Sequence, residues 1–144
     1  MGGHPYSYFV PYQADINAAL QSLREREFTA GRYNPAMSFP DECGDESPGA
    51  QHASIQEACV AAEADGTRSI LDLDAISDEP EFGCASPLSE SILLGLYGTA
   101  KPTREQIESD DRFMDEVDRG CGVYVVAYRE GRPEQIYFGG YSFD

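Results

Sequence analysis

The chain has 144 residues, and its 26 Asp and Glu residues against 10 Lys and Arg residues give a net charge of −16. A chain of this length has the size of one domain, so we expect residues 1–144 to form a single domain. No apolar run approaches the roughly 20 residues that cross a membrane. The negative charge disfavours direct binding of nucleic acid, because a phosphate backbone would be repelled.

The first third of the chain predicts one strand, one helix and one loop. Residues 6–12 are rich in aromatic and β-branched side chains, which indicates a short strand at a sheet edge or ending near Pro11. Apolar residues recur at helical spacing over residues 15–28, with Asp15 as the N-cap and Gly31 as the stop. Residues 32–53 show no such period and predict an unusually long loop.

The middle of the chain alternates between helix and strand signals. Residues 54–57 form a capping box that begins a helix reaching about Ala64. Alternating apolar and polar residues over 68–76 predict a strand with one buried face, followed by an acidic turn. Ser86 and Pro87 are typical of a helix start, and they predict a short apolar helix reaching about Tyr97.

The last third predicts one helix and a hairpin. A second capping box over residues 103–106 begins a helix that we expect to reach about Arg119. Residues 122–128 and 135–143 are the clearest strands, and residues 129–134 form the turn between them. Both faces of the first of these strands are apolar or aromatic, so we expect it near the centre of the sheet.

These elements together predict an α+β fold. We expect a single domain with a mainly antiparallel sheet of about four strands, helices packed on it and a C-terminal β-hairpin. The early strand and the late hairpin should bring the two termini into one sheet.

Motifs that carry chemistry are absent from the sequence. No phosphate-binding loop, nucleophile elbow or zinc-protease motif occurs. The cysteines lack the paired spacing of a zinc site, and the carboxylates between residues 72 and 78 do not fit an EF-hand loop. We therefore expect no catalytic residue, no metal ion and no cofactor. One alternative stays open, a nucleophilic pair of His52 with Cys43 or Cys84.

Two groups of residues are candidate binding sites. The first follows the first helix and combines a cation, an aromatic ring and an amide, residue types that are frequent in interfaces: Arg32, Tyr33 and Asn34. The alternative is a turn in which Tyr33 folds onto the core. The second is a ridge of like charges at helical spacing, which costs stability and is tolerated for docking or for solubility: Glu105, Glu108, Asp111, Asp115 and Asp118.

In size, charge and architecture the chain resembles the immunity proteins that neutralise bacterial toxins. The resemblance implies a small acidic interaction module, an inhibitor or immunity-type protein that binds a basic protein partner, such as a toxin or a nucleic-acid-processing enzyme. The N-terminus lacks the features of a secretory signal, so we expect a bacterial cytoplasmic location. Two alternatives stay open: an enzyme with an unrecognised carboxylate or histidine site, and an accessory domain.

The charge itself supplies a test. The acidic residues concentrate in three segments, 41–46, 72–81 and 105–118. Convergence of these segments on one face would favour a docking surface, and an even spread would favour solubility.

Overall fold

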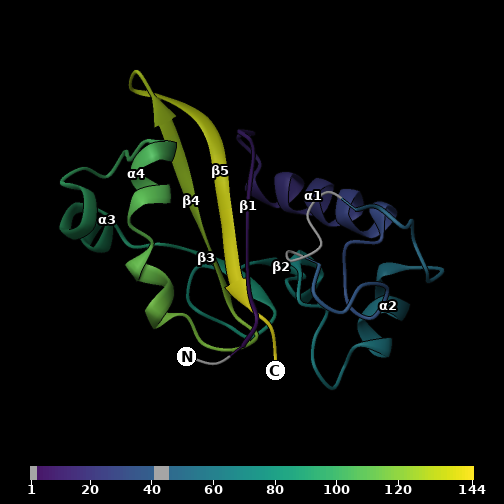
Figure 1. Cartoon of the computed structure of the whole chain (residues 1–144). Helices are drawn as coiled ribbons and strands as arrows, with labels where there is room; N and C mark the ends of the chain where they lie inside the picture. Colours follow the sequence, from purple (N-terminus) through teal and green to yellow (C-terminus); the bar gives the residue numbers. More distant parts are fainter. Residues whose placement is uncertain (1–2, 41–45) are drawn as a thin grey trace.

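A five-stranded sheet forms the centre of the computed structural model, which describes residues 3–40 and 46–144 (Figure 1). The strands lie in the order β1-β5-β4-β3-β2. Their bounds are β1 Pro5–Pro11, β2 Ala75–Ile76, β3 Cys84–Pro87, β4 Gly122–Arg129 and β5 Arg132–Tyr141. Strands β1, β5 and β4 are antiparallel, whereas β4, β3 and β2 are parallel. The predicted α+β class is confirmed, but the sheet is mixed and has five strands rather than four antiparallel ones.

Helices cover both faces of this sheet, with α1 and α2 on one side and α3 and α4 on the other (Figure 1). Their bounds, with the two 3₁₀ helices, are α1 Ile16–Ala30, α2 Ile55–Ala61, η1 Ile70–Asp72, α3 Glu90–Tyr97, α4 Arg104–Ser109 and η2 Arg112–Glu116. One hydrophobic core lies between the sheet and α1, α2 and η1, and a second lies between the sheet and α3, α4 and η2. Within the described ranges, no helix has the length and apolar character needed to span a membrane.

The N-terminal elements agree with the sequence prediction. Strand β1 lies at the sheet edge and pairs with β5, so the two ends of the chain meet in one sheet. The carboxylate of Asp15 accepts a hydrogen bond from the Ala18 N–H at 3.0 Å, and Gly31 ends α1 with a φ of 76°. Helix α2 ends at Ala61, three residues earlier than expected. Residues 32–40 and 46–53 contain neither helix nor strand, as predicted.

The predicted strand over residues 68–76 is wrong. Only Ala75 and Ile76 pair with a neighbouring strand, and the residues before them form the 3₁₀ helix η1. The Ser69 hydroxyl accepts a hydrogen bond from the Leu71 N–H at 3.2 Å, which closes the turn. Ile70, Leu71 and Leu73 are all fully buried. In a tight helical turn, two consecutive apolar residues can both be buried on one side. The alternating apolar and polar residues resembled a strand pattern and did not indicate this turn.

The predicted helix start at Ser86 and Pro87 is also wrong. Residues 84–87 form β3, and Pro87 lies at its last position opposite Tyr124 of β4. Helix α3 begins only at Glu90, where the Ser89 hydroxyl accepts a hydrogen bond from the Ile92 N–H. Proline is tolerated at a strand end as well as at a helix start, so the pattern was ambiguous.

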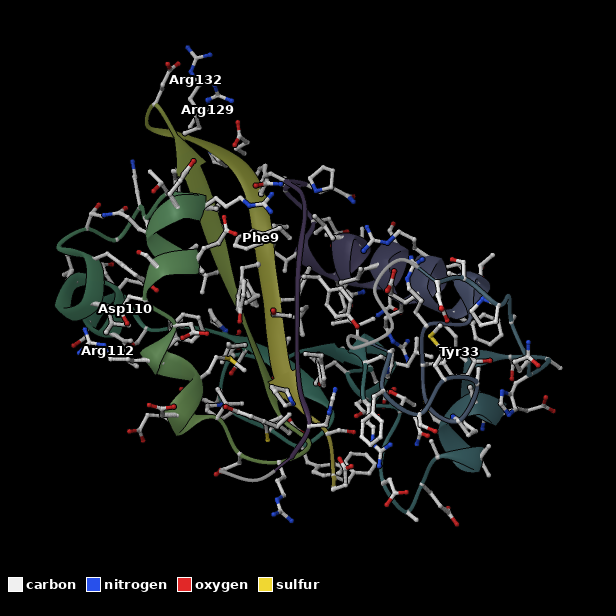
Figure 2. The ribbon with its side chains drawn as sticks, in the orientation of Figure 1. Phe9, Tyr33, Asp110, Arg112, Arg129 and Arg132 are labelled. Atoms are coloured by element: carbon white, nitrogen blue, oxygen red, sulfur yellow. The ribbon has the colours of Figure 1, made fainter. Side chains whose placement is uncertain are left out.

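The single helix expected over residues 103–119 is broken into α4 and η2. The capping box at its start is confirmed, because Thr103 and Gln106 exchange side-chain-to-backbone hydrogen bonds. The helix stops because Asp110 adopts an extended conformation, with a φ of −147°. The Asp110 carboxylate accepts two hydrogen bonds from the Arg112 guanidinium, at 2.8 and 2.6 Å, which favours a local turn (Figure 2).

The C-terminal hairpin is confirmed, with a tighter turn than expected. Only Glu130 and Gly131 connect β4 to β5, and both have positive φ, 52° and 77°. This geometry is typical of the two-residue turns that match the twist of a hairpin. Arg129 and Arg132 therefore pair across the strands at the tip (Figure 2). Strand β4 is the central strand of the sheet, as its two apolar faces predicted.

Candidate functional site

Two acidic stretches meet at the end of the sheet where β4 begins. The connection from β2 to β3, residues 77–83, lies against the turn before β4, because the Gly83 N–H donates to the Gly120 carbonyl at 2.7 Å. The Phe82 ring covers Gly120, and a Cβ at position 120 would lie 2.0 Å from that ring. Gly120 also has a φ of 77°, which favours glycine. Conformation and space thus both favour glycine at the contact between the two segments.

The two segments that meet here carry six exposed carboxylates, and we call the group the acidic end. Its members are Asp78, Glu79, Glu81, Asp115, Glu116 and Asp118. None of the six side chains forms an ion pair with a cation in the described part of the chain. Arg119, the neighbouring cation, is exposed and pairs with none of them. Clustered like charges without partners repel one another, so this arrangement costs stability.

Neighbouring side chains experience this negative charge. Burial raises the pKa of the Cys121 thiol, and the charge of Asp118 raises it further. Burial and then Glu81 raise the pKa of Cys84 in the same way. These two thiols lie side by side, because the residues after them, Ala85 and Gly122, are register partners in β3 and β4. Carboxylates from both acidic segments therefore act on one pair of neighbouring groups.

An exposed aromatic ring lies between the two acidic segments. The Phe82 residue is 65 % exposed, and its ring stacks on Phe143 with centroids 5.2 Å apart. Aromatic side chains surrounded by a polar rim are typical of the energetic centre of protein interfaces. The acidic end thus combines exposed carboxylates with an exposed apolar ring.

The predicted acidic ridge is only partly preserved. Asp115 and Asp118 belong to the acidic end, and Asp111 precedes η2 with an exposed side chain. Glu105 and Glu108 lie on α4, and Glu108 pairs with Arg104 at 3.0 Å. Because the helix breaks at Asp110, the five carboxylates do not form a continuous ridge.

The other predicted binding site, residues 32–34, is folded inward. Tyr33 is 0 % exposed, and its ring stacks on Phe28 with centroids 5.7 Å apart. The Tyr33 hydroxyl accepts a hydrogen bond from the Gln51 N–H at 3.0 Å. The expectation that Tyr33 faces a partner is therefore corrected: its ring attaches the long loop to α1.

The two neighbours of Tyr33 are engaged as well. Arg32 donates two hydrogen bonds to the buried carboxylate of Glu27, at 2.9 and 2.7 Å. The Asn34 side chain donates to the Gly66 carbonyl at 2.9 Å and is nine-tenths buried. Burial raises the pKa of Glu27, but hydrogen bonds from Arg32 and Arg26 outweigh burial and hold it below its ordinary value. These contacts are intramolecular, so they stabilise the fold.

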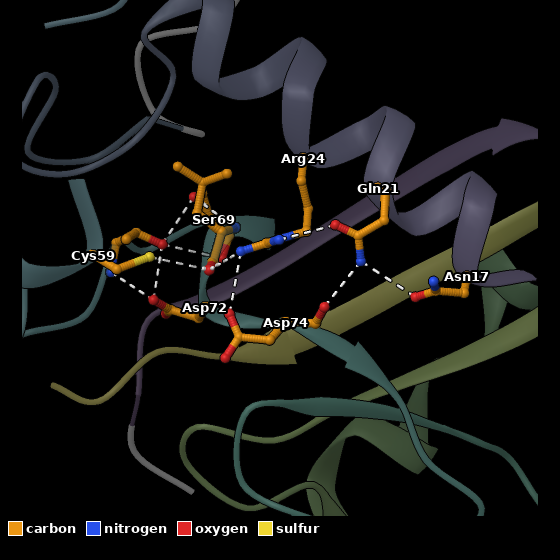
Figure 3. A network of polar contacts seen from close by, with 9 residues as sticks. Asn17, Gln21, Arg24, Cys59, Ser69, Asp72 and Asp74 are labelled. Atoms are coloured by element: carbon orange, nitrogen blue, oxygen red, sulfur yellow. Dashed lines mark hydrogen bonds and ion pairs between the residues drawn. The ribbon is translucent and has the colours of Figure 1, made fainter. Parts of the chain in front are cut away.

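A polar network joins α1 to η1 (Figure 3). Arg24 donates to Gln21 at 3.0 Å and to the Asp74 carboxylate at 3.2 Å. The Asp72 carboxyl group accepts three hydrogen bonds, two from Thr67 at 2.8 Å and one from Ser142 at 2.7 Å. Burial raises the pKa of Asp72 despite these bonds. Its oxygen atoms are thus engaged within the fold.

Catalytic and metal-binding arrangements were also considered. The Nδ1 atom of His52 forms a hydrogen bond with the Tyr33 hydroxyl at 2.9 Å. Its proposed partner Cys43 lies outside the described residues. In residues 3–40 and 46–144, no group of three His, Cys, Asp or Glu side chains could hold a metal ion.

Sequence reasoning assigned four of the six carboxylates of the acidic end to no site: Asp78, Glu79, Glu81 and Glu116. The acidic stretch over residues 77–81 was visible, but Glu79 and Glu81 were treated only as charged turn residues, and Asp78 was also rejected as part of an EF-hand loop. Phe82 carried the one usable signal, a large aromatic side chain within a polar turn. Its closeness to Gly120 depends on pairing between β3 and β4, and sequence patterns do not reveal this pairing.

Comparison of the chain with protein-family models, with curated proteins and with solved structures finds no match.

Proposed function

We propose that this chain is a small acidic interaction module, an inhibitor or immunity-type protein that binds a basic protein partner. The observation that carries the proposal is the acidic end: two segments in contact that carry six exposed carboxylates, none paired with a cation among the described residues, and the exposed ring of Phe82. The carboxylates would steer a basic partner toward this surface and speed association. The ring would lose its contact with water on binding and supply apolar contact energy.

The same arrangement favours a partner that acts on nucleic acids. A site that binds phosphates is basic, and clustered carboxylates present negative charge in a similar way. The proposal includes a bacterial cytoplasmic location. Free thiols at Cys59, Cys84 and Cys121 support a reducing compartment.

The enzyme alternative has less support from the described residues. The most deeply buried carboxyl group near a cleft, that of Asp72, uses its oxygen atoms in hydrogen bonds with Thr67 and Ser142. His52 is engaged with Tyr33. The accessory-domain alternative predicts evenly spread charge, whereas Glu81 and Asp118, from two distant segments, act on neighbouring thiols.

The test is capture of a partner, followed by binding measurements on the purified pair. Immobilised protein would be exposed to native lysate at about 0.05 M and about 1 M salt, which differ strongly in charge screening. The triple variant Asp115→Asn, Glu116→Gln, Asp118→Asn is expected to weaken binding about tenfold, and Phe82→Ala about thirtyfold.

Two controls separate this surface from charge and hydrophobicity in general. The triple variant Glu25→Gln, Glu46→Gln, Glu90→Gln removes the same charge from exposed positions elsewhere. Leu94→Ala removes an apolar side chain that is 49 % exposed on α3. Both controls should leave affinity nearly unchanged. Absence of a basic partner at low salt, or equal losses in test and control variants, would refute the proposal.

A further inference from the structure

The outer edge of the sheet is open along β1, its terminal strand (Figure 1). The Tyr12 N–H donates to the Glu134 carbonyl at 3.0 Å, one step beyond the register of β1 with β5. Because hydrogen-bonded pairs alternate in an antiparallel ladder, even-numbered residues of β1 pair with β5, and odd-numbered ones direct their N–H and carbonyl groups outward. The outward N–H groups of Ser7 and Phe9 have no hydrogen-bond partner among the described residues.

Two prolines limit this open edge to a short stretch. Pro5 and Pro11 are the other odd-numbered residues of β1, and proline has no N–H. They shield the edge from pairing with a long strand, as prolines on natural edge strands do. Between them, Ser7 and Phe9 can each exchange a pair of hydrogen bonds with a short extended segment.

Beside the first half of β1 lies a groove of about 390 Å³. Its lining includes Ser7 of β1, Tyr137 and Tyr141 of β5, and Asp111 from the link between α4 and η2. Asp111 is exposed and forms no ion pair with another described residue. Burial and then the charge of Asp111 raise the pKa of Tyr137, so this carboxylate acts on a ring that lines the groove. Aromatic rings beside an unpaired carboxylate suit the side chain of an arginine or a lysine.

At the other end of β1 a cation is already in place. The Arg104 guanidinium lies over the Phe9 ring, 4.4 Å from its centroid, and pairs with Glu108 at 3.0 Å. A positive side chain opposite Phe9 would meet this guanidinium, whereas one opposite Ser7 would meet Asp111. The charges along the edge therefore favour a segment whose positive side chain lies at the Ser7 end.

We propose that the edge of β1 binds an extended segment of the basic partner, which pairs with Ser7 and Phe9 and inserts an arginine or lysine side chain beside Asp111. In this mode of recognition, main-chain hydrogen bonds supply affinity and a side-chain pocket supplies specificity. This docking mode rests on the proposed function, since the segment belongs to the same basic partner. The edge also leads to the acidic end, because the Gly120 N–H donates at 2.9 Å to the carbonyl of Tyr141, the β5 residue opposite the start of β1.

A short synthetic peptide tests this pairing without the partner itself. The acetylated and amidated sequence Val-Thr-Arg-Thr-Arg, bound antiparallel, places its valine opposite Phe9 and its first arginine opposite Ser7. Amide hydrogen exchange of the full chain, followed by NMR, should be fast at Ser7 and Phe9 in the free protein and slower with the peptide. The matched peptide Val-Thr-Glu-Thr-Glu should not slow it. Unchanged exchange at both residues, or equal slowing by the two peptides, would overturn the proposal.

Methylation of the peptide backbone separates main-chain pairing from charge. Methyl groups on the nitrogen atoms of the valine and the first arginine remove the N–H groups that face β1, whereas methyl groups on the threonines remove only N–H groups that face solvent. The first change should weaken binding about tenfold, and the second should leave it nearly unchanged. Equal losses would contradict main-chain pairing.

Variants of the chain locate the site. Ser7→Pro removes one outward N–H at a position where an edge strand tolerates proline, and should weaken peptide binding about tenfold, whereas Ser7→Ala should not. Asp111→Asn should weaken it about twofold to fivefold. The triple variant Asp115→Asn, Glu116→Gln, Asp118→Asn should retain the slowed exchange at Ser7. Loss of peptide binding in the triple variant but not in Ser7→Pro would overturn the role of β1 and leave the proposed function standing.

Discussion

Two regions of the molecule, the C-terminal part of α1 with the residues that follow it and the acidic end, differ in what surrounds their charges. Along α1, Glu27 receives hydrogen bonds from Arg26 and Arg32 and is 4 % exposed. At the acidic end, six carboxylates are exposed and pair with no cation among the described residues. Arginine and carboxylates are present in both stretches of sequence, so composition alone does not separate the two. The difference is local pairing: paired charges can be buried and hold the fold together, and unpaired charges stay available to a partner.

The largest expected effect is at the paired carboxylate. Glu27→Gln leaves two guanidinium groups without their carboxylate, and we expect the free energy of unfolding to fall by about 2 to 3 kcal/mol. Asp118→Asn, the matched change at the acidic end, should cost nothing. Urea denaturation at neutral pH measures both, and a loss at Asp118 as large as that at Glu27 would contradict the comparison.

The pH dependence of the same pair follows from the lowered pKa of Glu27. A carboxyl group whose pKa is lower in the folded than in the unfolded state stabilises the fold above its unfolded value, here 4.5. That stability is lost as the pH falls through the lowered folded value. The difference in stability between wild type and Glu27→Gln should therefore shrink below about pH 4.5, and its growth on acidification would contradict the pairing.

Two glycines provide the next comparison. Gly31 and Gly120 have nearly equal positive φ values, 76° and 77°. A Cβ at Gly31 would lie 2.1 Å from the Gly49 carbonyl oxygen, a backbone atom, whereas at Gly120 it would meet the exposed Phe82 ring. We expect Gly31→Ala to cost about 2 to 3 kcal/mol and Gly120→Ala about 1 kcal/mol, because only the ring can move aside. Thermal unfolding would show this order, and equal costs would mean that Phe82 is held as rigidly as the backbone.

The sequence predicted the helix caps and the hairpin because these depend on short-range contacts. Asp15, Ser54 and Thr103 all cap helices as expected. It failed where pairing between distant segments decides the structure. Residues 84–87 form a strand because β4 lies beside them. Ala85 pairs with Gly122, which lies 37 residues later in the sequence. Local sequence patterns do not indicate the pairing of β3 with β4.

The candidate site was predicted only in part, because its residues come from segments that are far apart in the sequence. Asp115 and Asp118 were recognised as an acidic feature, but their neighbours Glu81 and Phe82 come from a different loop. Tyr33 was identified as an interface residue from its type, yet its neighbours Phe28 and His52 enclose it. Residue type indicates what a side chain can do, and only the fold decides whether it faces solvent.

The reactivity of Cys84 and Cys121 reports the negative electrostatic potential of the acidic end when no partner is bound. Glu81 and Asp118 raise the pKa of Cys84 and Cys121, so Glu81→Gln and Asp118→Asn should increase the thiolate fraction. Alkylation of these two thiols by iodoacetamide at pH 8 should accelerate about twofold to fivefold. Cys59, whose pKa is raised to about 11 mainly by burial, is the internal control and should not change. Mass spectrometry of peptides gives the alkylation rate of each thiol. No acceleration at Cys84 or Cys121 would show that Glu81 and Asp118 do not act on these thiols.

The smallest expected effect tests whether the acidic end costs stability. Each of Asp115→Asn, Glu116→Gln and Asp118→Asn should raise the free energy of unfolding by a few tenths of a kcal/mol at low salt, because repulsion is relieved. At about 1 M salt, where the screening length is about 3 Å, the gain should disappear. Glu134→Gln at the hairpin tip breaks an exposed pair with Arg129 at 3.4 Å, and should have the opposite sign. Urea denaturation at both salt concentrations compares the acidic-end variants with Glu134→Gln. A loss of stability at the acidic end would mean that its carboxylates serve the fold, and docking would no longer explain why they are unpaired.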